Sequence, residues 1–367
     1  MTHKTALLCA GGTGGHLFPA QALAHELKSR GWTVHLATDE RGTRYSDNFD
    51  IDGLHVIPSA TFGSKNPIAI VKAALRLVNG YRASKALIKK IGVDVAVGFG
   101  GYPSVPPMLA AQRMSVPTVL HEQNAVLGRA NKLLTKKADA VAAGFSSDSL
   151  PPDTVITGNP LRQEVLEITE RLGKSDTPYT KSDANDPFNL LVVGGSQGAQ
   201  YFGETVPKAI VLLPEELRKR VRLTLQARTE QIEQVKVLLS SHNVSASVAP
   251  FFDKMGMRLE QAQLVISRAG ASTVSEIAAM GRPSILVPYP HALDHDQAAN
   301  AAGLIERGGG TVVPQSQLTA SVLAEHLANA MTRPDELSKQ AHAAAMTGQP
   351  QATKQLADLV AAVGETS

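Results

Sequence analysis

The chain has 367 residues, a hydrophobic fraction of 43%, a charged fraction of 19% and a formal net charge of +3. These values are typical of a soluble protein with room for two domains, and the mild charge argues against nucleic acid as the default partner. The only cysteine, Cys9, excludes a disulfide framework, and the sequence has neither a signal-peptide pattern nor an apolar run of ~18 residues, so we expect a cytoplasmic protein without a membrane span.

Apolar strand-like runs alternate with helical patterns along the first half of the chain. The predicted strands are residues 5–10, 33–38, 94–98, 118–121 and 138–143, and a helical pattern covers residues 17–28 before Gly31. This alternation is typical of a doubly wound parallel sheet with helices on both faces.

A second series of predicted strands comprises residues 188–193, 222–226, 246–250, 264–267 and 284–287. The segments TALLCAGGTGGH and FNLLVVGGSQGA open the two series, and each is a strand followed by a Gly-Gly-Ser/Thr-x-Gly turn. We therefore predict an α/β protein with an N-terminal Rossmann-like domain (1–165), a linker or surface loop (166–187), a C-terminal Rossmann-like domain (188–345) and a C-terminal helix (346–367).

The two glycine turns have the chemistry of an anion site. Residues without a Cβ let backbone N–H groups approach a phosphate at the positive end of a helix. GGTGGHL lacks the third glycine of G-x-G-x-x-G and no Lys-Ser/Thr follows it, so a tight turn without a ligand is the alternative. His16 follows at the helix start, where a neutral base is favoured; a capping or packing histidine is the alternative there.

The segment HEQNAVLGRANK (121–132) places polar groups after a predicted strand, at the edge where open α/β sheets bind ligands. Glu122 and Asn124 either bind a hydroxyl or a proton in transfer, or cap the following helix.

The segment SRAGASTVSEIAAMGRPSILVPYP (267–290) predicts a strand, a turn at 270–275 and a helix that carries Glu276 in its first two turns. A diphosphate at this helix start would bring Glu276 within reach of ribose hydroxyls, although a glutamate there also stabilises the helix dipole. Asp294-His295-Asp296 is an incomplete metal site, so no metal is expected. The amide of Gln297 suits sugar hydroxyls.

Residues 53–93 contain no acidic residue and interleave basic with apolar side chains. The basic residues are Lys65, Lys72, Arg76, Arg82, Lys85, Lys89 and Lys90; the apolar ones are Ile68, Ile70, Val71, Leu75, Leu77, Val78, Leu87 and Ile88. A basic amphipathic segment suits an anionic membrane surface, and the alternative is a helix with one face on the sheet and a solvated basic face.

Six motifs, in order, resemble the MurG family of glycosyltransferases over residues 5–310: GGTGGH, GFGGYPS, HEQNAVLGRANK, GNPLR, GGSQGA and the segment 267–290. The resemblance implies a GT-B fold, with two Rossmann-like domains facing a cleft. It also implies inverting transfer of GlcNAc from UDP-GlcNAc to the 4-hydroxyl of MurNAc in undecaprenyl-pyrophosphoryl-MurNAc-pentapeptide, the lipid I to lipid II step of peptidoglycan synthesis. Such an enzyme is peripheral on the cytoplasmic face of the bacterial membrane and needs no cofactor.

The resemblance also implies site residues. On the donor side it places the diphosphate at Gly270, Ala271, Ser272, Thr273, Val274 and Ser275, the ribose at Glu276, the uracil at the Phe252 backbone, the phosphate side at Ser196 and the GlcNAc hydroxyls at Gln297. Thr13, Gly14, Gly15, Asn124 and Arg162 of the N-terminal half would also contact the donor. His16, Glu122 and His121 are the catalytic candidates, with Tyr102 and Asn131 on the acceptor side. A helix start that stabilises the leaving UDP makes a metal unnecessary.

Two positions depart from the family pattern. Asp296 precedes Gln297 where a histidine or glutamine is usual, and Gly203 stands where members often carry an asparagine. The alternative functions are a UDP-GlcNAc 2-epimerase-like GT-B enzyme, an NAD-dependent oxidoreductase and a non-catalytic nucleotide-sugar sensor. The basic amphipathic segment favours the transferase over the epimerase, and the missing third glycine argues against the oxidoreductase.

Overall fold

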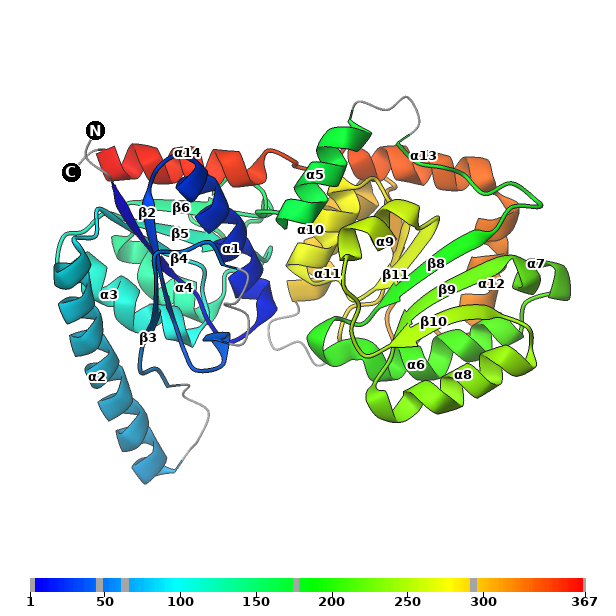
Figure 1. Ribbon diagram of the computed structural model, residues 1–367, viewed down its shortest axis with the longest axis horizontal. Coiled ribbons are helices and arrows are strands. Elements are labelled where there is room, and N and C mark those ends of the chain that lie inside the picture. Colours follow the sequence, from blue (N-terminus) through cyan, green and yellow to red (C-terminus); the bar gives the residue numbers. More distant parts are fainter. Residues whose placement is uncertain (1–3, 44–48, 61–65, 174–177, 291–295, 366–367) are drawn as a thin grey trace. The chain divides into compact units, whose positions relative to one another are not determined.

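The computed structural model describes residues 4–43, 49–60, 66–173, 178–290 and 296–365, without the side chains of 67, 68 and 195–199. The chain forms two compact units. The N-terminal unit comprises residues 1–162 together with 351–367, and the C-terminal unit comprises residues 163–350. Each unit is built on its own parallel sheet with helices packed against it (Figure 1).

The sheet of the N-terminal unit has seven strands in the order β3-β2-β1-β4-β5-β6-β7, and all neighbours are parallel. The strands are β1 (Thr5–Cys9), β2 (Thr33–Thr38), β3 (Gly53–Val56), β4 (Val95–Gly98), β5 (Thr118–Glu122), β6 (Ala140–Ala143) and β7 (Val155–Ile156). Chain order reverses between β1 and β4, so the turns after these strands lie where open parallel sheets bind ligands.

Helices cover both faces of this sheet. The side chains of β1 therefore alternate between two cores, one on each face. Ala6 and Leu8 face a core shared with helices α1 and α14, whereas Leu7 and Cys9 face a core shared with α2, α3 and α4. The helices are α1 (Gly14–Ser29), α2 (Pro67–Ile91), η2 (Tyr102–Ser104), α3 (Val105–Arg113), α4 (Arg129–Leu134), η3 (Thr135–Lys137) and α14 (Ala352–Glu365). Cys9 is a free, buried thiol.

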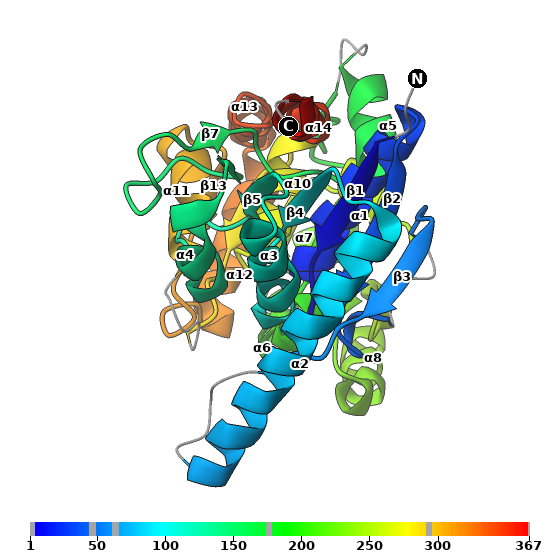
Figure 2. The ribbon, with the colours of Figure 1, turned by 90° about the vertical axis from the view of Figure 1, so that its left-hand side faces the viewer.

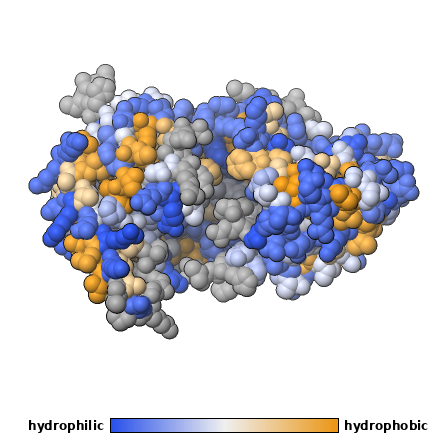
Figure 3. Space-filling model, turned by 60° about the horizontal axis from the view of Figure 1, so that its bottom comes forward, coloured by the Kyte–Doolittle hydropathy of each residue, from blue (hydrophilic) through white to orange (hydrophobic). Residues whose placement is uncertain are grey.

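Helix α2 carries an exposed apolar face on its N-terminal half, which extends beyond the rest of the N-terminal unit (Figure 2). Ile70, Val71, Leu75 and Val78 are 44–59% exposed, whereas Leu87 and Ile88 near its C-terminal end are buried in the core. Figure 3 shows groups of hydrophobic side chains (orange) among hydrophilic ones (blue) on the N-terminal unit, at the left. The helix is therefore anchored at one end and presents apolar side chains at the other.

The C-terminal unit repeats the design with six parallel strands in the order β10-β9-β8-β11-β12-β13. The strands are β8 (Phe188–Val193), β9 (Val221–Gln226), β10 (Ser245–Ala249), β11 (Leu264–Ser267), β12 (Ser284–Leu286) and β13 (Gly310–Val312). Its helices are α5 (Gln163–Leu172), α6 (Gly195–Val211), α7 (Glu215–Arg220), η4 (Thr229–Gln231), α8 (Ile232–Ser241), α9 (Met255–Gln261), α10 (Ala271–Ala279), α11 (Asp296–Glu306), α12 (Ala320–Thr332) and α13 (Pro334–Ala345). Two parallel α/β sheets confirm the predicted fold class.

The segment expected to be a linker or surface loop (166–187) begins inside a helix. Residues up to Leu172 lie in α5, which packs on α9. Further along, the Tyr179 hydroxyl donates to Gln263 O (3.0 Å) and Arg282 donates to Pro178 O (2.7 Å). Described parts of this segment are thus bound to the C-terminal unit, through the Tyr179 side chain in one hydrogen bond and the Pro178 backbone in the other.

The C-terminal helix is not an independent element either. α14 packs on α1, and its Leu356 and Val360 are fully buried in the core of the N-terminal unit. The predicted boundaries at 345 and 346 therefore move to about residue 350, where the chain passes from the C-terminal unit to the N-terminal one.

Candidate active site

The turn after β1 places His16 at the start of α1. Gly12 has φ +83°, a conformation that a glycine adopts without strain. Thr13 is extended and caps the helix, and its carbonyl accepts from His16 N–H (3.1 Å) and Leu17 N–H (3.2 Å). The predicted helix start at residue 17 is therefore three residues too late, because Gly14 and Gly15 already belong to the first turn.

His16 is half-buried, and its Nδ1 lies 3.3 Å from the Thr13 hydroxyl oxygen. Burial lowers the pKa of its imidazole, against the opposing effect of a hydrogen bond with the Gly11 backbone. The ring is neutral near pH 7, as a general base requires.

The turn after β4 lies against His16. Gly101 has φ +74°, and a Cβ there would lie 3.1 Å from Gly11 O and 3.5 Å from His16 Nδ1. A Cβ at Gly100 would lie 3.3 Å from Asn131 Nδ2. The GFGGYPS motif thus contacts both His16 and Asn131, and Tyr102 begins η2 immediately after it.

Glu122 ends β5 and is 3% exposed. Its carboxylate accepts from Asn124 N–H (3.0 Å), Gly128 N–H (2.9 Å) and Asn131 Nδ2 (2.8 Å). Burial raises the pKa of this carboxyl, and the hydrogen bonds oppose that shift. Glu122 therefore organises the loop before α4, as the capping alternative describes, and its role in contact with substrate stays a prediction.

His121 is fully buried, and both ring nitrogens are engaged. Nε2 lies 3.0 Å from Gly158 O and Nδ1 lies 3.1 Å from Gln123 Nε2, so the proton is on Nε2 and Nδ1 accepts. Burial lowers the pKa of His121 to about 4. The ring of His121 is enclosed, and its one N–H proton is directed at Gly158 O; its catalytic role stays a prediction.

Two further candidates of the N-terminal unit are half-buried. The amide Nδ2 of Asn124 approaches Glu122 Oε1 at 3.4 Å, and the guanidinium carbon of Arg162 lies 5.7 Å from the centre of the Phe18 ring. Phe18 lies in turn beneath Gly14, where a Cβ would come within 2.8 Å of the ring. Arg162 is thereby attached to the first turn of α1.

In the C-terminal unit, the turn after β11 leaves an open helix start. Gly270 is extended and caps α10, and a Cβ there would meet no atom within 4 Å. The first intrahelical bond runs from Val274 N–H to Gly270 O (2.9 Å), so the N–H groups before it have no intrahelical partner. Ser272 Oγ is buried without a hydrogen-bond partner among the described residues. This arrangement suits a bound anion.

Glu276 lies in the second turn of α10, near the helix start as predicted, and is 5% exposed. Near it, Asn300 is 1% exposed, and its Nδ2 donates to Ala269 O (3.2 Å), which attaches α11 to the turn after β11. The sequence analysis did not single out Asn300. Its position three residues after Gln297 places both side chains on one face of the helix, and this spacing could have indicated it.

Gln297 lies in the first turn of α11, where its Oε1 accepts from Tyr289 N–H (2.9 Å). Asp296 is the first residue of that helix, and Asp294 and His295 fall outside the described residues.

Phe252 follows β10 and is 7% exposed, with the Arg258 guanidinium 4.4 Å above its ring. Ser196 lies in the first turn of α6, with a side chain outside the described part of the structure.

The absence of a side chain at Gly203 leaves room for the side chain of Gln231. A Cβ there would lie 2.7 Å from Gln231 Oε1. The Gln231 amide accepts from Arg228 N–H (3.3 Å) and donates to Gln200 O (3.1 Å). An asparagine at 203 would displace this amide.

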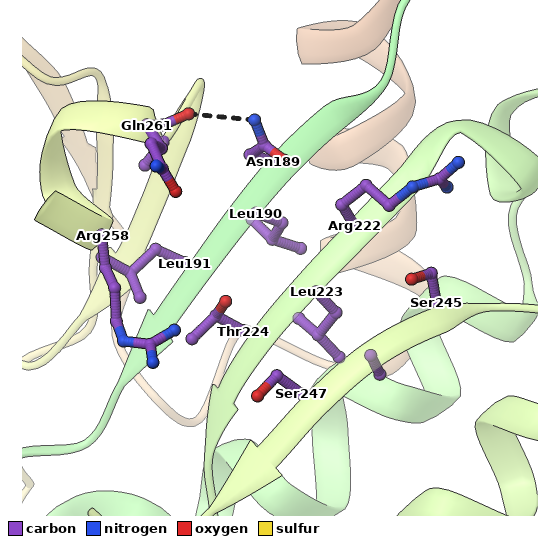
Figure 4. Close-up of a pocket in the computed structure, with 12 residues that line it drawn as sticks. Asn189, Leu190, Leu191, Arg222, Leu223, Thr224, Ser245, Ser247, Arg258 and Gln261 are labelled. Carbon is purple, nitrogen blue, oxygen red and sulfur yellow. Dashed lines mark hydrogen bonds between the residues drawn. The ribbon is translucent and has the colours of Figure 1, made fainter. Parts of the chain in front are cut away.

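A shallow pocket of about 290 Å³ lies on the sheet of the C-terminal unit, between β8, β9, β10 and α9 (Figure 4). Its lining includes Arg222, Thr224 and Ser247, with Arg258 pointing in from α9 and Asn189 donating to Gln261 O (3.1 Å). None of the predicted site residues lines it. Each unit therefore carries its own group of candidate residues: the turns after β1, β4 and β5 in the N-terminal unit, and the turns after β10, β11 and β12 in the C-terminal unit.

Comparison with known proteins identifies this combination. The model of the glycosyltransferase family 28 N-terminal domain matches residues 6–143, and that of the glycosyltransferase family 28 C-terminal domain matches residues 189–356. The chain is 53% identical, over 100% of its length and 97% of the relative's, to a UDP-N-acetylglucosamine--N-acetylmuramyl-(pentapeptide) pyrophosphoryl-undecaprenol N-acetylglucosamine transferase of Allorhizobium ampelinum. A relative of the same name from Chelativorans sp. is also 53% identical, with coverage of 100% and 97%.

Among solved structures, MurG of Acinetobacter baumannii matches with a TM-score of 0.78 and 30% identity, over 98% of this chain and 99% of that one. A UDP-GlcNAc 2-epimerase of Neisseria meningitidis bound to UDP-GlcNAc matches with a TM-score of 0.67 and 13% identity, over 98% and 100%, which shows a shared fold alone. The match of both domain models and the identity over the full length establish that the chain belongs to glycosyltransferase family 28.

Proposed function

We propose that the chain transfers GlcNAc from UDP-GlcNAc to the 4-hydroxyl of MurNAc in undecaprenyl-pyrophosphoryl-MurNAc-pentapeptide, with inversion, which converts lipid I to lipid II. The family relationship supports this reaction. The observation that carries it is the open start of α10, with the unpartnered Ser272 hydroxyl and the buried Glu276 one turn behind it. A helix start binds a diphosphate, and a carboxylate accepts hydrogen bonds from a ribose diol.

Donor binding in the C-terminal unit follows from this placement. The turn from Gly270 to Ser275, together with Ser196, would hold the diphosphate, and Glu276 the ribose. The backbone of Phe252 would contact the uracil, and the amide of Gln297 the hexose. In the N-terminal unit we propose further donor contacts for Thr13, Gly14, Gly15, Asn124 and Arg162.

His16 is the proposed general base. Its neutral imidazole takes the proton of the acceptor 4-hydroxyl while the hydroxyl oxygen attacks the anomeric carbon and the bond to UDP breaks on the opposite side. The α10 start stabilises the negative charge that develops on the leaving diphosphate. Tyr102 belongs to the acceptor side. Glu122 and Asn131 hold the loop next to it, and His121 positions the segment at Gly158.

The lipid-linked acceptor also requires access to a membrane. Among the described helices, none is long and apolar enough to cross one. We propose that the N-terminal half of α2 rests on an anionic membrane surface at the cytoplasmic face, as a peripheral contact. Its apolar face offers Val71 and Leu75, with Lys72 and Arg76 beside them on the same turns. Apolar burial and attraction of the basic residues to anionic lipids would act together.

The deciding experiment measures UDP release from UDP-GlcNAc with and without a lipid-linked MurNAc-pentapeptide. The proposal predicts release only when the acceptor is present. Release or epimerisation of UDP-GlcNAc without acceptor would favour a 2-epimerase-like enzyme, and binding of UDP-GlcNAc without any turnover would favour a sensor.

A further inference from the structure

Arg268 is a buried charge beside the proposed donor turn. It follows the last residue of β11 and is 7% exposed. Its Nη1 donates to Val287 O (3.1 Å) and Pro288 O (3.2 Å), and its Nη2 donates to Gln315 Oε1 (2.6 Å). Burying a guanidinium is costly, and within the described residues no carboxylate forms an ion pair with it. The cost is offset here by carbonyl and amide acceptors and not by an opposite charge.

Aromatic rings complete this environment. The guanidinium carbon lies 5.6 Å from the ring centre of Tyr201, 5.0 Å from that of Phe202 and 5.4 Å from that of Tyr289. Such cation–π contacts favour a planar guanidinium over a compact ammonium. Helix α6, the end of strand β11 and residues 287–289 after β12 therefore meet on this one side chain.

The connection held by Arg268 fixes the amide of Gln297. Arg268 binds the carbonyls of Val287 and Pro288, and the next N–H, that of Tyr289, donates to Gln297 Oε1 (2.9 Å). A backbone N–H needs an oxygen as acceptor, so the orientation of this amide follows from chemistry. The oxygen of the Gln297 amide therefore faces this N–H, and its NH₂ group, a hydrogen-bond donor, is the part of the amide not used in this contact.

We propose that Arg268 is a positioning residue: it sets the peptides of residues 287–289 and thereby the side-chain amide of Gln297, so that the NH₂ group donates to a hydroxyl oxygen of the donor hexose. This inference rests on the proposed function and adds a residue that contacts no substrate. It assigns to Arg268 an effect on which hexose is selected. Binding of the UDP moiety would instead depend on the start of α10 and on Glu276.

The test is Arg268→Lys, which keeps the charge but loses the planar fork that bridges Val287, Pro288 and Gln315. We expect the KM for UDP-GlcNAc to rise about tenfold, as for one well-oriented hydrogen bond, and the preference for UDP-GlcNAc over UDP-GalNAc and UDP-glucose to fall by a similar factor. The Kd of UDP alone, measured by calorimetry, should change less than about twofold, because the helix start is intact.

Arg282→Lys is the matched control. Arg282 is another buried arginine of the same unit, lies over the Tyr179 ring and donates to a backbone carbonyl, at the opposite end of α10. The Arg282→Lys variant should have a lower Tm and an unchanged hexose preference. If Arg268→Lys does not fold, Gln315→Leu removes one partner of the guanidinium and should shift hexose preference in the same direction, by roughly threefold.

A double variant separates positioning from general support. In a Gln297→Ala background, Arg268→Lys should change hexose preference by less than about twofold, because both act through one amide. Independent, multiplying effects would overturn the proposal, as would unchanged hexose preference in folded Arg268→Lys protein or a parallel loss of UDP binding. If wild-type protein gave no acceptor-dependent UDP release, the proposed function itself would be wrong; unchanged preference in an active variant would reject the role of Arg268 alone.

Discussion

In each unit, polar groups lie at the edge of the parallel sheet where its strands end. The two units differ in how far these groups are hydrogen-bonded to other residues of the protein. In the N-terminal unit, Glu122 accepts from Asn124, Gly128 and Asn131, and both nitrogens of His121 are engaged, so that within this described network only Asn131 Oδ1 is buried without a partner. In the C-terminal unit, the start of α10 is open and Ser272 Oγ is buried without a described partner.

This difference has a physical meaning. Buried donors and acceptors that are already paired make a rigid, preformed surface, and those left unpaired gain most from a ligand. On the proposed function, the largely paired groups of the N-terminal unit would position His16. The C-terminal unit has the open helix start that, on the proposed function, the donor would complete.

The largest expected effect tests the first half of this comparison. His16→Ala should lower kcat by about a thousandfold, within the range for loss of a general base, with a small change in the KM for UDP-GlcNAc. Since the pKa of His16 is lowered, kcat/KM of the wild type should stay high as the pH falls through 6.5, and decline only below that value. Steady-state UDP release against pH measures both. His25→Ala, an exposed histidine of the same helix, should leave the rate unchanged.

The second prediction concerns the stability that the buried, hydrogen-bonded ring of His121 contributes at different pH values. Its folded-state pKa is depressed to about 4 from 6.5, so the unfolded chain takes up the proton first. The stability contributed by the neutral ring is complete above pH 6.5 and is lost as the pH falls toward 4, by roughly 3 kcal/mol.

Urea unfolding at several pH values measures this effect. His121→Gln should lose less stability than the wild type between pH 6.5 and 4, although it should be less stable at pH 7, because its hydrogen bonds are altered. His342→Gln, at an exposed site, should follow the wild type. A His121→Gln variant with the full pH dependence would contradict the assignment.

A third prediction concerns the open site of the C-terminal unit. Glu276→Ala should raise the KM for UDP-GlcNAc by roughly thirtyfold and leave kcat nearly unchanged, since a buried carboxylate that binds a diol contributes to donor binding in both the ground and transition states. Glu306→Ala on α11 is the exposed control. A fall in kcat with no change in KM would place Glu276 in the chemical step and weaken the contrast between the units.

The smallest effect is expected at α2. Leu75→Glu should weaken binding to anionic vesicles about tenfold, because it removes one side chain of apolar burial and adds a repelled charge. Leu212→Glu, an equally exposed leucine of the C-terminal unit, is the control. Sedimentation with phosphatidylglycerol vesicles measures it, and equal loss in both variants would reject α2 as the membrane contact.

Much of this molecule follows from local patterns. The predicted strands at 5–10 and 188–193 match β1 and β8 closely, because continuous apolar runs are typical of strands buried on both faces. The strand at 33–38 matches β2, whose apolar and polar residues alternate. The short edge strands β3, β7 and β13 were missed, since their side chains are half-buried or exposed and carry no strong pattern.

The sequence by itself determined the two glycine-turn sheets, His16 at a helix start and Glu276 one turn behind a phosphate-type turn, because each depends on neighbouring residues. Tertiary structure alone decided which polar residues form hydrogen bonds with other residues of the protein. It buries His121 against Gly158, 37 residues away, and brings Arg268 to the carbonyls of Val287 and Pro288. Burial and hydrogen-bond partners come from segments distant in sequence, and only the packed sheet brings those segments together.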